Sequence, residues 1–134
     1  MSKDISRETK ILQSIPAQSA AVGTLNGVAI DCQNFDQAVI VLNAGTLTTG
    51  TVDAKVQESD TVGGTYSDVT GAVFPQVTSA NDVASYVGFI ELNARKRFLR
   101  VVAVVGTLAS LISADIILVR PSHGADGAAP TFAV

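Results

Sequence analysis

The chain has 134 residues, of which 47% are hydrophobic and 16% are charged, with a formal net charge of −3. This length suits one domain, and the high apolar share excludes an intrinsically disordered chain. A pI near 4.9 argues against nucleic-acid binding, which would need a basic face. The apolar residues are mainly Val, Ala, Leu and Ile, and aromatic residues make up 5% of the chain, so the composition favours sheet over helix.

The two ends of the sequence differ from its middle. Residues 1–10 mix both charge signs and lack the apolar segment of a secretory signal, so they are expected to form an N-terminal arm. Residues 121–134 are rich in Gly, Ala and Pro, which predicts an extended C-terminal arm. No apolar run approaches the roughly 20 residues of a membrane helix. We therefore expect one domain at 11–120, made in a cytoplasm and not bound to a membrane.

The first half of the domain shows turn residues between short apolar stretches. Residues 11–15 predict a first edge strand that ends at Pro16, because proline lacks the N–H that a strand ladder needs. Asn26-Gly27 lies between apolar stretches, and both residues tolerate a positive φ, so the pair predicts a tight hairpin. The continuous apolar run within 36–44 indicates a strand that is covered on both faces.

The clearest strand signal is an alternation of apolar and polar residues. Val52, Ala54 and Val56 alternate with polar neighbours, which predicts one core face and one solvent face. The looser stretch 70–85 is long enough to cross between two sheets, and helical spacing over 107–118 competes with a strand there. About eight strands at roughly ten-residue spacing predict an all-β fold, a single-domain antiparallel β-sandwich of jelly-roll or Greek-key type. Besides those above, strands are expected at 66–69, 86–93, 97–106 and 108–120.

Few side chains offer the chemistry of a catalytic or metal site. His123 is the chain's one histidine and lies in the C-terminal arm, without a rigid frame for acid–base catalysis. Cys32 has no histidine nearby to activate it, so it is expected to be a small buried hydrophobe. Glu58, Asp60 and Asp68 surround a Gly-Gly turn but do not follow the spacing of a calcium-binding loop. We expect no catalytic residue, no cofactor, no metal and no small-molecule substrate.

Four of the nine basic residues, Arg95, Lys96, Arg97 and Arg100, lie within six positions. One interpretation is a basic rim that docks on an acidic partner surface. The other is a solvated turn whose arginines pair with Glu91 or Asp82 across the hairpin. Aromatic residues do not alternate with these cations, which argues against nucleic acid as the partner.

Two segments of the sequence resemble a known family. The segment "VDAKVQESDTVGGTYSDVTGA" at 52–72, followed by "NARKRFLRVVAVVGT" at 93–107, is similar to small head decoration or capsid-stabilising proteins of tailed bacteriophages. The similarity extends over about residues 50–110. It implies a non-enzymatic β-sandwich that binds the major capsid protein as a homo-oligomer, with a trimer favoured, on the capsid surface of the virion. It transfers no active-site residue.

Two other roles are open. A phage tail or head–tail connector component would have a similar composition and could assemble into rings through exchanged arms. A carbohydrate-binding or adhesin module would need exposed aromatic platforms, whereas the chain has no Trp and two tyrosines, Tyr66 and Tyr86.

Overall fold

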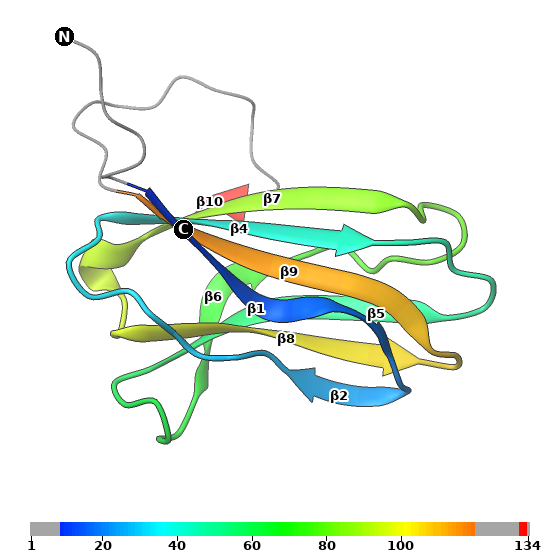
Figure 1. Cartoon of the computed structure of the whole chain (residues 1–134), viewed down its shortest axis with the longest axis horizontal. Helices are drawn as coiled ribbons and strands as arrows, with labels where there is room; N and C mark the ends of the chain where they lie inside the picture. Colours follow the sequence, from blue (N-terminus) through cyan, green and yellow to red (C-terminus); the bar gives the residue numbers. More distant parts are fainter. Residues whose placement is uncertain (1–8, 120–131, 134) are drawn as a thin grey trace, which may run out of the picture.

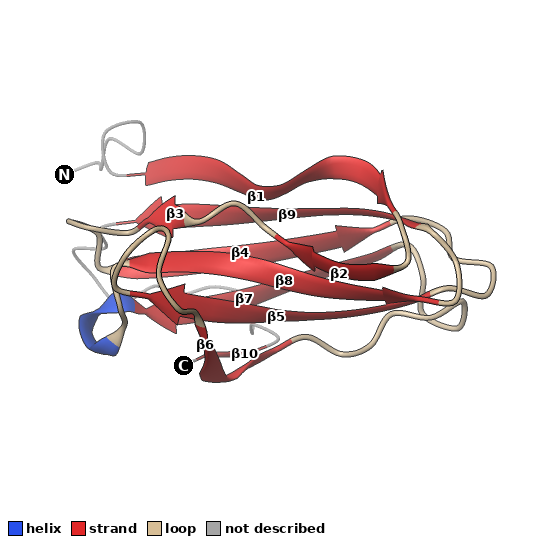
Figure 2. Cartoon of the chain, turned by 90° about the horizontal axis from the view of Figure 1, so that it is seen from below, coloured by secondary structure: helices blue, strands red, loops and turns tan. Residues whose placement is uncertain are grey.

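The structure, a computed structural model, describes residues 9–119 and 132–133. Nearly all regular elements in this part of the chain are strands, and a single turn of 3-10 helix, η1, precedes β8 (Figure 2). The strands are β1 (Thr9–Ala20), β2 (Gly23–Asn26), β3 (Ile30–Asp31), β4 (Gln37–Ala44), β5 (Thr51–Ser59), β6 (Ser67–Val73), β7 (Ala84–Glu91), β8 (Phe98–Gly106), β9 (Ser110–Val119) and β10 (Phe132–Ala133), and η1 spans Leu92–Ala94.

The strands form two sheets that pack face to face (Figure 1). One sheet, sheet A, has the order β1-β9-β4-β7-β10, and the other, sheet B, has the order β2-β8-β5-β6, with β3 also paired to β8. Apart from the two-residue strands β3 and β10, the first strand pairs with the last, the second with the second last, and so on inward to the β5–β6 hairpin. The pairs β4–β9 and β5–β8 then join these hairpin layers side by side. This order is the jelly roll.

The predicted all-β sandwich is therefore confirmed, and its connectivity is that of a jelly roll. One pair departs from the antiparallel rule, because β10 runs parallel to β7. β1 begins at Thr9, inside the segment expected to be an arm, and β10 lies inside the expected C-terminal arm. The other residues of the two predicted arms lie outside the described residues.

The core lies between the sheets and is made of residues at every second position. In β8, Leu99, Val101 and Ala103 are fully buried, and the β5 residues Val52 and Val56 are buried on the same face of the sheet. The alternation predicted for β5 is confirmed, and the last long strand, β9, is a strand rather than a helix.

The expectation for β4 was wrong in one respect. Its buried residues, among them Ala38, Ile40 and Leu42, alternate with half-buried ones, so one face of the strand meets the core and the other faces outward. The continuous apolar run has a different reason. β4 lies between β9 and β7, and their side chains partly cover Val39 and Val41 on the outer face.

Pro16 does not end the first strand. β1 continues through it to Ala20, and the register with β9 shifts between Gln13 and Ile15 and again between Ile15 and Gln18. β1 is an edge strand of sheet A, and the irregularity leaves Pro16 without a cross-strand partner. A missing N–H is tolerated at such a place, because no ladder hydrogen bond is lost.

The hairpin predicted at Asn26-Gly27 is absent, because β2 and β3 both pair with β8 and not with each other. Gly27 instead allows a close approach of two backbones. Its N–H donates to the Val101 carbonyl oxygen at 2.8 Å. A Cβ at position 27 would lie 2.5 Å from that oxygen and would also collide with the Ser14 hydroxyl.

Ser14 of β1 joins the two sheets at this point. Its hydroxyl accepts a hydrogen bond from the Val101 N–H at 2.9 Å and donates one to the Val28 carbonyl oxygen at 3.0 Å. The Val28 N–H donates in turn to the Ser14 carbonyl oxygen at 2.6 Å. Ser14 is fully buried, so these bonds satisfy a polar group inside the protein. We call Ser14, Gly27, Val28 and Val101 the Ser14 joint; it closes the long side of the sandwich between β1 and β2.

Replacing Gly27 with alanine is expected to lower the free energy of unfolding by about 1–3 kcal/mol, because the added methyl group overpacks the Ser14 joint. Gly63→Ala is the matched control: a Cβ there meets no atom within 4 Å, so the change should stay within about 0.5 kcal/mol. Urea denaturation of both variants measures the difference. Equal effects at the two positions would contradict this account of the joint.

Candidate interaction surface

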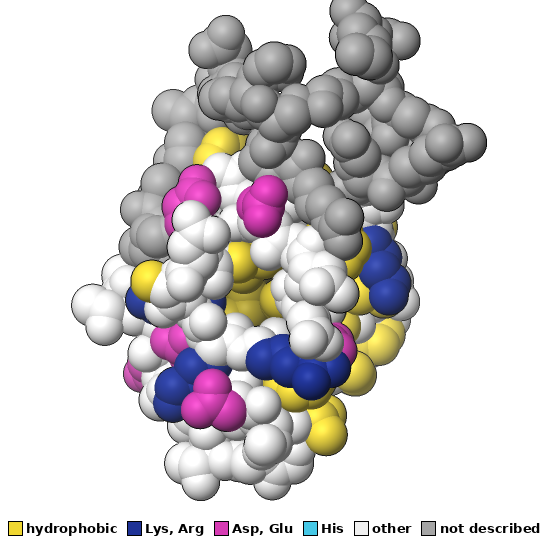
Figure 3. All heavy atoms as spheres, turned by 90° about the vertical axis from the view of Figure 1, so that its left-hand side faces the viewer, with side chains coloured by type: hydrophobic (Ala, Val, Ile, Leu, Met, Phe, Trp, Pro, Cys, Tyr) yellow, Lys and Arg dark blue, Asp and Glu magenta, His cyan; other side chains and the backbone are white. Residues whose placement is uncertain are grey.

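The basic residues singled out in the sequence lie at the junction between η1 and β8. Arg95, Lys96 and Arg97 form the turn between them, which we call the basic turn, and Arg100 lies on the outer face of β8. The turn is at the end of the sandwich that Figure 3 presents to the viewer. Lys and Arg side chains there lie beside Asp and Glu side chains rather than forming an unbroken basic patch (Figure 3).

Glu58, near the end of β5, anchors the basic turn to sheet B. Its carboxylate accepts a hydrogen bond from the Lys96 backbone N–H at 2.8 Å and one from Arg95 Nη1 at 3.3 Å. Glu58 is buried, with its side chain 11% exposed, and a carboxylate in such a place needs partners of this kind. The ion pair therefore fixes the conformation of the turn as well as neutralising Arg95.

Arg97 pairs with Asp31 of β3. Arg97 Nε donates to Asp31 Oδ1 at 2.9 Å and Arg97 Nη2 donates to Oδ2 at 2.8 Å, so the pair is bidentate. The guanidinium also lies over the Phe98 ring, 5.2 Å from its centroid. The hydrogen bond from Arg97 is the main cause that lowers the pKa of Asp31 to about 2, with a further contribution from the Gln33 N–H. Since both side chains are exposed, the pair orients the turn more than it stabilises the fold.

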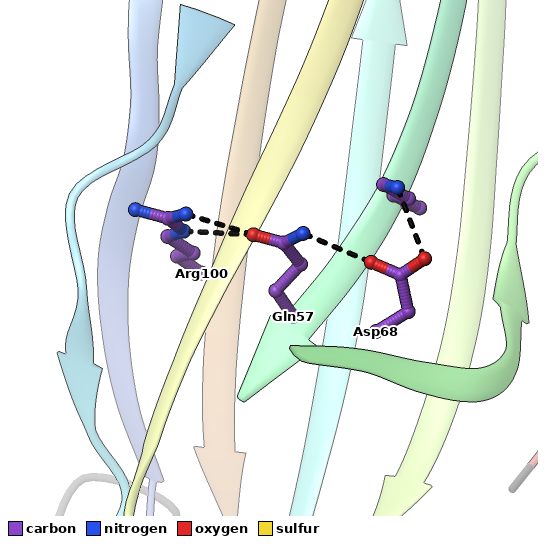
Figure 4. A network of polar contacts seen from close by, with 4 residues as sticks. Gln57, Asp68 and Arg100 are labelled. Atoms are coloured by element: carbon purple, nitrogen blue, oxygen red, sulfur yellow. Dashed lines mark hydrogen bonds and ion pairs between the residues drawn. The ribbon is translucent and has the colours of Figure 1, made fainter. Parts of the chain in front are cut away.

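Arg100 takes part in a row of polar contacts across the outer face of sheet B (Figure 4). Its guanidinium lies 3.9 Å from the centroid of the Tyr66 ring, and its Nε and Nη2 donate to Gln57 Oε1 at 3.1 and 2.8 Å. Gln57 Nε2 donates to Asp68 Oδ1 at 2.9 Å, and Lys55 Nζ donates to Asp68 Oδ2 at 3.0 Å. These bonds from Gln57, and then Lys55, lower the pKa of Asp68. The row connects β8, β5 and β6.

The arginine partners expected from the sequence were wrong. Glu91 accepts a hydrogen bond from Gln37 at 2.7 Å, and Asp82 accepts one from the Leu47 N–H at 2.8 Å. The real partners come from β3 and β5, which are distant in the sequence but adjacent to β8 in the sheet. Among the described residues, the Lys96 ammonium has no hydrogen bond or ion pair, so Lys96 is the exposed cation of the basic turn.

A depression of about 300 Å³ borders the basic turn. Its lining includes side chains of the turn together with Gln33, Phe35 and Leu92. A second depression, of about 490 Å³, lies on the outer face of sheet A around Gly45 and Leu111, and no titratable residue lines it. Of the two, the first combines positive charge with a concave surface.

The remaining candidates from the sequence are separated in the structure. Cys32 is buried, its thiol donates to the Ile30 carbonyl oxygen at 3.5 Å, and burial raises its pKa to about 12, which confirms it as a small buried hydrophobe. Glu58 and Asp68 have the separate partners described above, and Asp60 is exposed. The part of the chain that the structure describes holds no cluster of three His, Cys, Asp or Glu side chains that could bind a metal. His123 lies outside it.

Replacing Arg97 with glutamine is expected to raise the pKa of Asp31 from about 2 toward its ordinary value of 3.8. Because the folded-state pKa is the lower one, the stabilisation by this carboxylate is complete above the unfolded-state pKa and is lost as the pH falls through the folded one. Carboxyl-carbon NMR titration measures the shift directly. Lys96→Gln, one position away, is the control and should leave the titration of Asp31 unchanged.

The Cys32 thiol is expected to resist a disulfide reagent such as DTNB in the native protein at pH 8, because burial removes both access and thiolate. In denaturant, one thiol per chain should react at once. Rapid reaction of the native protein would show instead that the loop between β3 and β4 opens easily.

Within the described residues, no helix is long and apolar enough to cross a membrane. No protein-family model matches the sequence, and no curated protein matches it. In structure, the chain is similar to the SPBc2 prophage-derived protein YomS, solved by crystallography, with a TM-score of 0.60. The alignment covers 84% of this chain and 93% of that chain at 9% sequence identity. The chain therefore shares its β-sandwich fold with a protein derived from a prophage.

Proposed function

We propose that the chain is a non-enzymatic structural protein of a tailed-phage particle, which decorates and stabilises the head by binding the lattice of the major capsid protein as a homo-oligomer. The observation that carries the proposal is the jelly roll shared with a prophage-derived protein. Jelly rolls also occur in lectins and cupins, so the fold alone does not decide the function. The similarity of residues 52–72 and 93–107 to head decoration proteins favours the capsid role.

The chemistry of the described side chains supports a structural role. Cys32 is buried, and the carboxylates of Asp31, Glu58 and Asp68 are each bound to a cation or an amide of the same chain. Catalysis needs polar groups that converge on a space where a substrate fits. The three carboxylates named here are instead each engaged by a different partner within the chain.

The basic turn is the surface that best suits an acidic partner. Glu58 and Asp31 hold its backbone and two of its arginines in place, so little conformational freedom is lost on docking. The Lys96 ammonium takes no part in these pairs, and Lys96 lines the depression of about 300 Å³, which offers a concave contact. The proposed arrangement is therefore a rigid turn with one free positive charge, placed against an acidic region of the capsid protein.

The carbohydrate-binding alternative has less support. Arg100 covers one face of the Tyr66 ring. Tyr86 is half-buried, its hydroxyl accepts a hydrogen bond from Asn81 at 3.2 Å, and its ring lies 6.3 Å from that of Phe74. Neither tyrosine is a free platform for stacking a sugar ring.

Purified chain is expected to co-sediment with purified heads of the phage that carries its gene and to saturate at a fixed number of copies per head. Isolated tails and connectors from the same phage are the control. Binding to those parts alone would favour the tail or connector alternative. Absence of binding to any of the three would contradict both roles.

A matched pair of variants tests the role of the basic turn in that assay. Lys96→Gln removes its free charge, and we expect head binding to weaken by about twofold to fivefold, the effect of one exposed charge pair. Thr48→Glu lowers the net charge equally in the exposed loop between β4 and β5, at the opposite end of the sandwich. Equal weakening by both variants would mean that net charge, and not the basic turn, governs binding.

A further inference from the structure

The two long sides of the sandwich are closed in different ways. On the side of β1 and β2, the Ser14 joint connects the sheets by hydrogen bonds. On the opposite side, β7 is the outermost long strand of sheet A and β6 is the edge of sheet B. The two-residue strand β10 pairs with β7 and also lies against β6 (Figure 2). We call the edge of β7 with which β10 pairs, together with the neighbouring part of β6, the edge slot.

The pairing of β10 is weakly constrained by the rest of the fold. Phe132 pairs with Gly88 and Ala133 with Phe89, and no other register pair of β10 is formed among the described residues. A parallel pair has no tight turn to fix its register. The twelve residues 120–131 connect β9 to β10 along the sequence.

The connection is longer than the position of β10 requires. β4 and β7 separate β9 from β10, which makes about 14 Å at a strand spacing of about 4.8 Å. A dozen residues reach up to about 40 Å when extended. That length is about three times the radius of gyration of about 14 Å expected for a domain of this size. The same connection is therefore long enough to deliver β10 to the edge slot of an adjacent subunit.

We propose that β10 is exchanged between subunits, so that in the assembled protein the edge slot of one copy is filled by Phe132–Ala133 of a second copy. The inference rests on the proposed function in one respect, that copies of the chain associate. Exchange keeps the same strand pairing and covers the same strand edge. The balance between the exchanged form and the closed monomer therefore depends mainly on the concentration of the chain. If each of three subunits gives its β10 to the next one around a ring, the ring closes as a trimer, and no new contact surface is needed.

The test is a disulfide between the register partners Phe89 and Ala133. A Phe89→Cys/Ala133→Cys variant, made in a Cys32→Ala background, is oxidised at a concentration at which light scattering shows association. We expect covalent dimers and larger species on a non-reducing gel as the greater part of the product. A monomeric cyclised product alone, or no disulfide at all, overturns exchange.

Two controls make the result specific. Val41→Cys/Val87→Cys joins the register partners of β4 and β7, which belong to the body of one subunit, and it should crosslink only within a chain. Mixing the Phe89→Cys chain with the Ala133→Cys chain should give a disulfide-linked dimer of the two if the strand is exchanged, and unlinked monomers if it is not.

Failure of exchange and failure of the proposed function are distinguishable. Association with only intramolecular disulfides overturns exchange while the homo-oligomer stands. Intermolecular disulfides in a protein that does not bind heads support exchange and contradict the capsid role. A chain that stays monomeric at every concentration overturns exchange.

Discussion

The jelly roll depends on how its two sheets are held together at the side where the chain enters. The Ser14 joint is a set of directed bonds between β1 of sheet A, the 27–28 segment and β8 of sheet B. Those bonds form only because residue 27 has no side chain. The joint also explains why β1 is irregular: its register must shift for Ser14 to turn inward while the remainder of the strand stays paired with β9.

The arginines near the basic turn, like Ser14, are satisfied by partners within the chain. Arg95, Arg97 and Arg100 each meet a partner from a strand that neighbours β8 in sheet B, so the cationic cluster of the sequence becomes a set of braces between strands. In the proposed function, bracing of the turn and binding of a partner fall on different residues. The arginines position the basic turn, and Lys96 remains outside their pairs.

Much of the fold was predictable from short-range patterns in the sequence. The alternation in β5 identified core and solvent faces correctly, because it depends only on neighbouring residues. Local chemistry was a poorer guide at Pro16 and Asn26-Gly27. Pro16 lies in an edge strand, where its missing N–H costs no ladder hydrogen bond. Gly27 does not form a hairpin turn but allows close packing against Ser14. The partners of Arg97 and Arg100 could not be predicted, since Asp31 and Gln57 lie 66 and 43 positions away in the chain.

The register of sheet A shows which segments lie at each end of the sandwich. Thr9, Val119, Gln37 and Glu91 lie in one row across the strands, so the chain enters the sandwich and leaves β9 at the end where η1 begins. The loops 45–50 and 107–109 lie at the far end. A peptide inserted in either of those loops would thus be displayed at the pole opposite both chain attachments, and a fusion at residue 9 would sit at the pole that carries the basic turn. The domain therefore separates a site of attachment at one end from a site of display at the other by about the length of one strand.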